Sequence, residues 1–166
     1  MNTKQNGFSL VEILIVIVII GIIAAVAIPN LLASRRSANE ASAISSVKVI
    51  STSQATYISS VGRGEYATLN QLGTGGFVDN VIACSTPLCT KSGYNFAMTV
   101  SAEVLGVSPA QFNVTGVPVL FALDYTATGT RSFYSNEVGV TYYTQSGTAP
   151  SGVSVTQRRP TSGSPL

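Results

Sequence analysis

The sequence has no histidine, only two cysteines and few charges, since Asp, Glu, Lys and Arg make up 10% of its 166 residues. The seven acids are isolated in the sequence and no nucleophile motif accompanies them, so we expect no enzymatic activity. A metal site needs more ligands than two cysteines without histidine can readily supply. Gly73, Gly75 and Gly76 lack the spacing and the following lysine of a phosphate-binding loop, so we expect a plain loop there and no cofactor.

Basic residues are also scarce. Nine Lys and Arg residues leave a net charge of +2, and they cluster only in the doublets Arg35-Arg36 and Arg158-Arg159. This balance is too small to indicate a polyanion-binding surface, so we expect no nucleic-acid partner. Solvated charge is the expected state of the second doublet.

The two cysteines, Cys84 and Cys89, lie close together in the segment CSTPLC. Pro87 favours a turn between them because its ring fixes φ. This spacing predicts a small disulfide loop in an oxidising compartment, which would place this part of the chain outside the cytoplasm.

Charges are absent altogether from residues 13–28, a run without a single polar side chain. As a helix the run is about 24 Å long at 1.5 Å per residue, and residues 8–11 extend it to the length of a bilayer span. A lone segment in hydrocarbon must be helical, because a strand would leave its backbone groups unpaired. The run is too long for the apolar core of a cleaved secretory signal peptide, but it would also suit a plain signal anchor.

Glu12 distinguishes this segment from a plain anchor. A charged side chain at bilayer depth costs on the order of 2.5–3.5 kcal/mol, and such carboxylates usually have a partner. No Lys, Arg or His lies within several residues of Glu12. If the chain were cut before Phe8, the new α-amine would lie about one helical turn away and could pair with Glu12 of the same chain or of a neighbouring copy. A pair between copies would fix the stagger of identical helices.

The pattern GFSLVE, followed by the apolar run and then by Pro29, resembles the class III signal of type IV pilins and type II secretion pseudopilins. The resemblance covers residues 6–36. It implies cleavage between Gly7 and Phe8 by a prepilin peptidase, followed by N-methylation of Phe8. It also implies that Glu12 pairs with the terminal amine of the adjacent subunit during filament assembly.

The same resemblance implies partners and locations. Identical subunits, the peptidase, an assembly platform and a cytoplasmic ATPase are the implied partners. The precursor would lie in the bacterial inner membrane, and the mature subunit in an extracellular pilus or a periplasmic pseudopilus. Gly21 and Pro29 are the expected positions of a helix kink, because proline removes one helical hydrogen bond and glycine weakens a helix interior.

Beyond Pro29 the apolar positions keep a helical period as far as Val61, with one weak position at Gln54, and Gly62 is the expected stop. We therefore predict one helix from Phe8 to Val61, apolar all round in its first half and amphipathic in its second. The apolar positions of the second half are Ile44, Val47, Ile50, Tyr57, Ile58 and Val61.

The rest of the chain predicts strands. YNFAMTV, residues 94–100, alternates apolar and other residues, and VPVLFALDYTATGTRSFYSNEVGVTYY, residues 117–143, predicts two or three further antiparallel strands. Turns are expected at Thr128-Gly129 and across 135–139, and Pro118 is expected near the start of an edge strand. The aromatic residues expected in the core are Phe121, Tyr125, Phe133, Tyr134, Tyr142 and Tyr143.

The fold class is therefore α+β, with a long N-terminal helix packed against a three- or four-stranded antiparallel sheet, in a pilin-like arrangement. The predicted organisation is a leader over 1–7, a membrane or filament-core helix over 8–29, an amphipathic half over 30–62, a globular β domain over 63–145 and an exposed, flexible tail over 146–166.

Three functions stay open at this point. The favoured one is a structural subunit of a type IV pilus, serving adhesion, motility or DNA uptake. The alternative within the family is the major pseudopilin of a type II secretion system. A protein of a different class, a monomeric membrane-anchored binding domain, would give Glu12 no role. Asp79, Asp124 and Glu137 could gather around calcium, but solvated acids are favoured, and Asn113 begins only a weak glycosylation signal.

Overall fold

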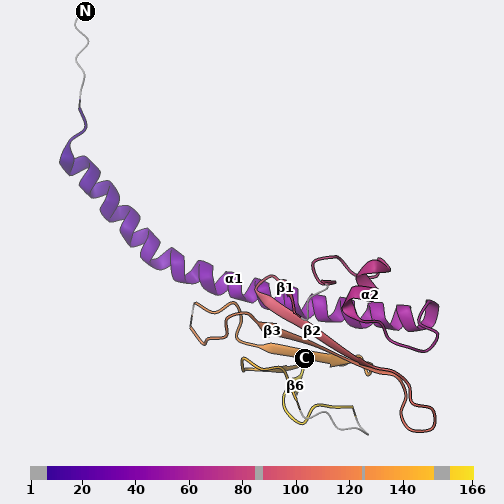
Figure 1. Ribbon diagram of the computed structural model, residues 1–166. Coiled ribbons are helices and arrows are strands. Elements are labelled where there is room, and N and C mark those ends of the chain that lie inside the picture. The colour runs from indigo at the N-terminus through magenta and orange to yellow at the C-terminus, as the bar shows by residue number, and fades with distance from the viewer. Residues whose placement is uncertain (1–6, 85–87, 125, 152–157) are drawn as a thin grey trace, which may run out of the picture.

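A computed structural model describes residues 7–84, 88–124, 126–151 and 158–166. One long helix, α1 (Leu10–Ser60), lies with its second half along a face of an antiparallel sheet, while its first half projects beyond the sheet (Figure 1). The short helix α2 (Leu69–Thr74) follows it. This is the α+β arrangement predicted from the sequence. The strands pair in chain order and are β1 (Cys89–Lys91), β2 (Tyr94–Ser101), β3 (Gln111–Pro118), β4 (Ser132–Asn136), β5 (Tyr142–Thr144) and β6 (Ser164–Pro165).

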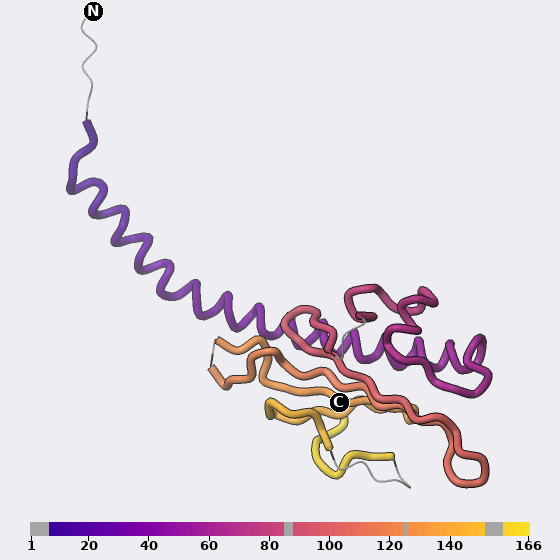
Figure 2. The backbone as a smooth tube through the Cα atoms, in the orientation of Figure 1, coloured from indigo at the N-terminus to yellow at the C-terminus, as the bar shows by residue number. Residues whose placement is uncertain are grey.

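Helix α1 is continuous from the projecting half to the head, which is the second half of α1 together with α2 and the sheet. It begins after Ser9, whose backbone is extended (φ −75°, ψ 140°), and it passes through Pro29 without a break. It ends at Ser60, and the amide of Gly62 then donates to the carbonyl of Tyr57 at 2.8 Å. These bounds confirm the single helix and the stop that the sequence predicts. Figure 2 shows that the helix axis bends between its projecting half and the half on the sheet.

The second half of α1 packs on the two central strands, β3 and β4. Ala43, Val47 and Ile50 are buried on this face, as the amphipathic pattern predicts. Gly116 of β3 makes room for the ring of Phe96 on β2, because a Cβ there would lie 3.1 Å from that ring, whereas it would be at an ordinary contact distance of 3.5 Å from Val47 of α1. Buried side chains of the sheet and of the intervening loops complete this core, among them Leu72, Ile82, Tyr94, Phe112, Val114 and Phe133.

Strand β2 confirms the predicted alternation. Tyr94 and Phe96 are fully buried, and Met98 and Val100 continue the same face half-buried at its edge. The strand pairs over its whole length with β3, with Tyr94 opposite Pro118.

The predicted position of the next strand is wrong. β3 ends at Pro118 instead of beginning near it, because proline has no amide to donate to the ladder. The described residues that follow, 119–124 and 126–131, form neither helix nor strand. The expected hairpin turn at Thr128-Gly129 is instead a loop contact, in which the amide of Thr128 donates to the carbonyl of Leu120 at 2.9 Å. Gly129 lies against Tyr94, since a Cβ there would be 1.9 Å from the tyrosine hydroxyl.

The second predicted turn is confirmed between β4 and β5. The amide of Gly139 donates to the carbonyl of Asn136 at 2.9 Å, and the φ of Gly139 is 81°, in the region that glycine adopts readily. Of the expected core aromatic residues, Phe133, Tyr134 and Tyr142 are buried. Phe121 and Tyr143 are half-buried, whereas Tyr125 lies outside the described residues.

The loop predicted for the glycine cluster is confirmed at Gly75 and Gly76, which lie in the turn after α2, but it is wrong for Gly73. Thr68 caps α2: its side chain accepts from the amide of Gln71 at 3.3 Å, and the Gln71 side chain accepts from the amide of Thr68 at 2.8 Å. Gly73 lies inside this helix, where a Cβ would be 2.1 Å from the Cβ of Ala83. The glycine therefore serves close packing.

The last residues add a sixth strand to the sheet, so the sheet is wider than the predicted three or four strands. β6 pairs with β5, with Pro165 opposite Tyr142, and the amide of Leu166 donates to the carbonyl of Thr141 at 2.9 Å. Residues 152–157 of the tail, like residues 1–6 of the leader and Pro87, lie outside the described residues. The flexibility of the tail stays a prediction.

Candidate functional site on helix α1

The projecting half of α1 exposes apolar side chains in every direction. All of its large apolar side chains from Leu10 to Leu31 are exposed, and so is Phe8 just before the helix. By length and composition alone, α1 is the one helix of the described residues that could cross a membrane. A bare apolar surface of this extent requires a cover of lipid or of protein.

Glu12 is the only charged residue between Phe8 and Leu31. Its amide donates to the carbonyl of Ser9 at 3.1 Å, which places it in the first turn of α1, where the helix dipole favours a negative charge. No hydrogen bond or ion pair to its carboxylate occurs within the described part of the chain. The site thus offers an acceptor that the head of the same molecule does not satisfy.

The two predicted kink positions lie on this bare half. A Cβ on Gly21 would meet nothing within 4 Å, so packing within the chain does not require this glycine. Pro29 lies inside α1 and borders an apolar hollow of about 370 Å³, which is also lined by Ala24, Ala25, Ile28 and Leu32. A kink at either residue stays a prediction.

Glu40 bonds α1 to the loop before β4, near the point where the helix first contacts the rest of the head. Its carboxylate accepts from the amide and hydroxyl of Thr130, at 2.8 and 2.7 Å, and forms a 2.8 Å ion pair with Nε of Arg131. Burial alone would raise the pKa of Glu40, whose side chain is 8% exposed. The Thr130 hydrogen bonds and the Arg131 guanidinium outweigh burial and hold the pKa below its ordinary value.

Sequence reasoning missed Glu40, although its position carried a signal. It lies about one helical turn before Ala43 and two before Val47, on the face that becomes buried. Gln54, the weak position of the pattern, is fully buried on the same face. Its Oε1 accepts from the amide of Ala67 at 3.0 Å and its Nε2 donates to the carbonyl of Ala67, so it ties the chain after α1 back to the helix.

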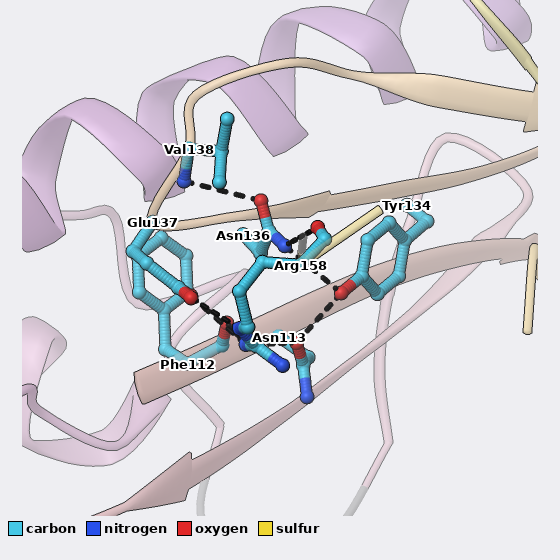
Figure 3. A network of polar contacts seen from close by, with 7 residues as sticks. All are labelled: Phe112, Asn113, Tyr134, Asn136, Glu137, Val138 and Arg158. Carbon is cyan, nitrogen blue, oxygen red and sulfur yellow. Dashed lines mark hydrogen bonds and ion pairs between the residues drawn. The ribbon is translucent and has the colours of Figure 1, made fainter. Parts of the chain in front are cut away.

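The expectation of solvated charge is wrong for Arg158. Figure 3 shows its guanidinium in an ion pair with Glu137 and in a hydrogen bond to Oδ1 of Asn113 at 2.9 Å. The Tyr134 hydroxyl donates to the same oxygen at 2.7 Å, and Nδ2 of Asn136 donates to the carbonyl of Arg158 at 2.6 Å. Burial alone would raise the pKa of Glu137, but Arg158 holds it below its ordinary value.

The other acids weighed for calcium also have partners on the protein. Asp79 forms a 2.7 Å ion pair with Lys91, and Asp124 accepts from the hydroxyl and amide of Thr126, at 2.6 and 2.9 Å. Over the described ranges, no three His, Cys, Asp or Glu residues gather in a way that could hold a metal ion. Asp79, Asp124 and Glu137 therefore each have a hydrogen-bond or ion-pair partner on the protein.

Cys84 and Cys89 form the predicted disulfide bond. Cys89 is buried at the start of β1, and Cys84 packs against the core from the preceding loop. The bond thus joins the edge strand to the segment that follows α2.

The apolar first half of α1 is exposed and continues without a break into the small α+β head. This arrangement is typical of proteins that are anchored in a membrane, or assembled with other copies, through one helix. Comparison with known proteins agrees with this class. Residues 2–28 match the family described as the prokaryotic N-terminal methylation motif. No solved structure matches the chain.

Three relatives carry names from two related systems. The type II secretion system core protein G of Escherichia coli (strain K12) is 37% identical over 68 residues, which are 41% of this chain and 46% of that protein. The type IV major pilin protein PilA of Myxococcus xanthus is 37% identical over 62 residues, 37% of this chain and 28% of that protein. The type IV wide pilus major component PilA4 of Thermus thermophilus is 68% identical over 37 residues, 22% of this chain and 28% of that protein.

The chain spans less than half the length of each of these three relatives. Together with the methylation motif, these matches make part of the chain similar to the family of type IV pilins and type II secretion pseudopilins, and the long helix packed on a small sheet agrees with that likeness. The proteins of this family are structural.

Proposed function

We propose that this chain is a structural subunit of a type IV pilus. In this proposal a prepilin peptidase cuts between Gly7 and Phe8 and methylates the new amine of Phe8. The precursor waits in the inner membrane with its head outside, and an assembly platform and a cytoplasmic ATPase move it into an extracellular filament of identical subunits. The helix packs in the filament core, and the sheet forms the outer wall.

The observation that carries the proposal is the state of Glu12. Its carboxylate lies in a bare apolar helix, and nothing in the described part of the same molecule pairs with it. Leaving such a charge unpaired among the packed apolar helices of a filament core is costly. The amine of Phe8 on a neighbouring copy supplies the missing cation, and the pair sets the axial register of the two helices. A monomeric anchored domain gives Glu12 no comparable use.

The second candidate is the major pseudopilin of a type II secretion system. The relative named type II secretion system core protein G supports it. The physical account of Glu12 is the same, but the filament would stay short and periplasmic, and loss of the subunit would abolish secretion instead of removing surface fibres.

The test is Glu12→Ala in the bacterium that encodes the chain, with Glu103→Ala as a matched control. Glu103 is an exposed acid of the head, so the control removes the same charge far from the helix. We expect Glu12→Ala to remain in the membrane fraction while sheared surface filaments disappear from electron micrographs. The control should assemble normally.

Mass spectrometry of the main filament band tests the processing. We expect an N-methylated Phe8 at the N-terminus. A mature subunit that retains Met1, or normal filaments from Glu12→Ala, would contradict the proposal. If the unmodified strain forms no surface fibres, and Glu12→Ala abolishes protein secretion, the chain would instead be assigned to the pseudopilus.

A further inference from the structure

The apolar surface of α1 ends close to the head. Residues 12 to 32 of the helix measure about 30 Å at 1.5 Å per residue, the thickness of a bilayer's hydrocarbon core. Asn30 does not interrupt this surface, because its Nδ2 folds back and donates to the carbonyl of Val26 at 3.0 Å. When Glu12 lies at one edge of the hydrocarbon, Leu32 lies at the other.

The first charges beyond that edge are Arg35 and Arg36. Arg36 lies about 6 Å beyond Leu32 along the helix, and the headgroup layer is about 5–7 Å thick on each side of the bilayer. The two arginines are therefore at the level of the lipid phosphates. Arg35 is exposed, and no ion pair to it occurs in the part of the chain described here.

The loop between β3 and β4 descends along α1 to this same level. Three side chains of α1 hold it, in order toward the membrane: Glu40 bonds Thr130, Asn39 donates to the carbonyl of Thr128 at 3.1 Å, and Arg36 donates to the carbonyl of Asp124 at 2.8 Å. Figure 1 shows this loop at the end of the head from which the projecting half of α1 departs.

The part of the loop nearest the membrane is apolar and bare. Leu123 is 79% exposed, and Leu120 and Val119 are about half exposed. The carboxylate of Asp124 is satisfied within the loop by Thr126. A loop that presents leucines beside two arginines has the composition of a segment that lies in a lipid interface, with apolar side chains below the phosphates and cations among them.

We propose that residues 119–124, together with Arg35 and Arg36, form a lipid contact that seats the head on the outer surface of the membrane before assembly. The inference rests on the proposed membrane-anchored precursor. Lipid is the expected partner of this surface, and not a second copy of the chain, because residues 119–124 continue the apolar surface of α1 at the depth where α1 leaves the bilayer. Anionic phosphates complement the arginines.

The test uses fluorescence, because the chain has no tryptophan and a single introduced one reports alone. The full-length precursor is placed in vesicles of phosphatidylethanolamine and phosphatidylglycerol whose acyl chains are brominated near the headgroup, and, for the reporter of insertion, in vesicles whose acyl chains are brominated near their ends. Leu123→Trp is the reporter. Leu105→Trp is the matched control, since Leu105 is an equally apolar and 87% exposed side chain in the β2–β3 loop. Ile20→Trp, in the middle of the proposed span, reports insertion.

We expect the tryptophan at position 123 to emit at shorter wavelength than the one at 105 and to be quenched by the brominated lipids, while the one at 105 is not. Quenching at 20 but not at 123 would overturn this inference and leave the proposed function intact. A blue shift at 123 without quenching would also overturn it, because a second copy would then cover the loop. Absence of quenching at 20 would overturn the membrane anchoring on which both proposals rest.

Discussion

At the scale of single residues, polar side chains on the buried face of α1 decide how the head is attached. Glu40 and Gln54 lie on the same face as Val47 and Ile50; Glu40 bonds Thr130, far along the chain, and Gln54 bonds Ala67 just after the helix. Without its partner, each would be a buried polar group that costs about 1–3 kcal/mol. The attachment is therefore specific as well as apolar.

Glu40 makes the stability of the head depend on pH. Its pKa is lower in the folded protein than its ordinary value of 4.5, so its contribution is complete above pH 4.5 and is lost as the pH falls through the folded pKa. We expect Glu40→Gln to lower the free energy of unfolding by about 1–3 kcal/mol at neutral pH and to weaken its decline in acid. Urea unfolding in detergent, followed by circular dichroism from pH 7 to pH 3, measures this.

The control for this prediction is Glu103→Gln, which changes an exposed acid. Its unfolding curve should follow that of the unmodified protein at every pH. Parallel pH profiles for Glu40→Gln and the unmodified protein would show that the Thr130 and Arg131 contacts contribute nothing.

Gly129 tests a steric contact in the same region. A Cβ there would lie 1.9 Å from the hydroxyl of Tyr94, which donates to the carbonyl of Arg131 at 2.8 Å. We expect Gly129→Ala to destabilise the head by about 1–3 kcal/mol or more. Tyr94→Phe should recover part of this loss, because it removes the nearest atom, and a double-mutant cycle by thermal unfolding would measure the coupling. Gly21→Ala, at an open position, should leave the head unchanged; an additive cycle would refute the contact.

At the scale of elements, α1 and β2 could be predicted because their patterns repeat over many residues. α1 has an unbroken apolar run followed by a helical period, and β2 alternates four large side chains. β3 could not be predicted, because Gly116, which lies close against the ring of Phe96, interrupts its apolar alternation. The apolar run at 119–123 has the composition of a strand, but Pro118 ends the ladder before it.

The disulfide is an element-scale constraint on the edge of the sheet. Cys84 and Cys89 close a short loop, and in the chain-entropy account such a loop stabilises the folded state by about 2 kcal/mol. We expect the double change Cys84→Ala/Cys89→Ala to lower the free energy of unfolding by that amount. Reductant should destabilise the unmodified protein equally and leave the variant unaffected; a reductant effect on the variant would contradict this.

At the scale of the whole molecule, the last residues close the sheet on the side away from α1. Arg158 is held by Glu137 and Asn113, and β6 pairs with β5. The sequence could not reveal this, because a polar tail carries no periodic signal and the partners of Arg158 lie on β3 and next to β4. The site on α1, in contrast, follows from the local pattern around Glu12.

We expect Arg158→Gln to loosen the last strand while the core stays folded. Amide hydrogen exchange of residues 158–166 should become faster, because the amide of Leu166 loses its steady bond to Thr141. Mass spectrometry of peptic peptides measures the exchange. Arg35→Ala removes a cation from the other end of the head and should leave these rates unchanged. Unaltered exchange in Arg158→Gln would mean that β6 is held by its strand pairing alone.

The continuity of α1 has a mechanical consequence. Because no linker separates the bare half from the half on the sheet, a pull on the head is transmitted as tension along one rod. Each turn of the helix carries the full tension. Pro29 removes one helical hydrogen bond, so the turn around Pro29 is the first place at which the helix can stretch. Extension under force would therefore begin in the bare half of α1 and spare the head.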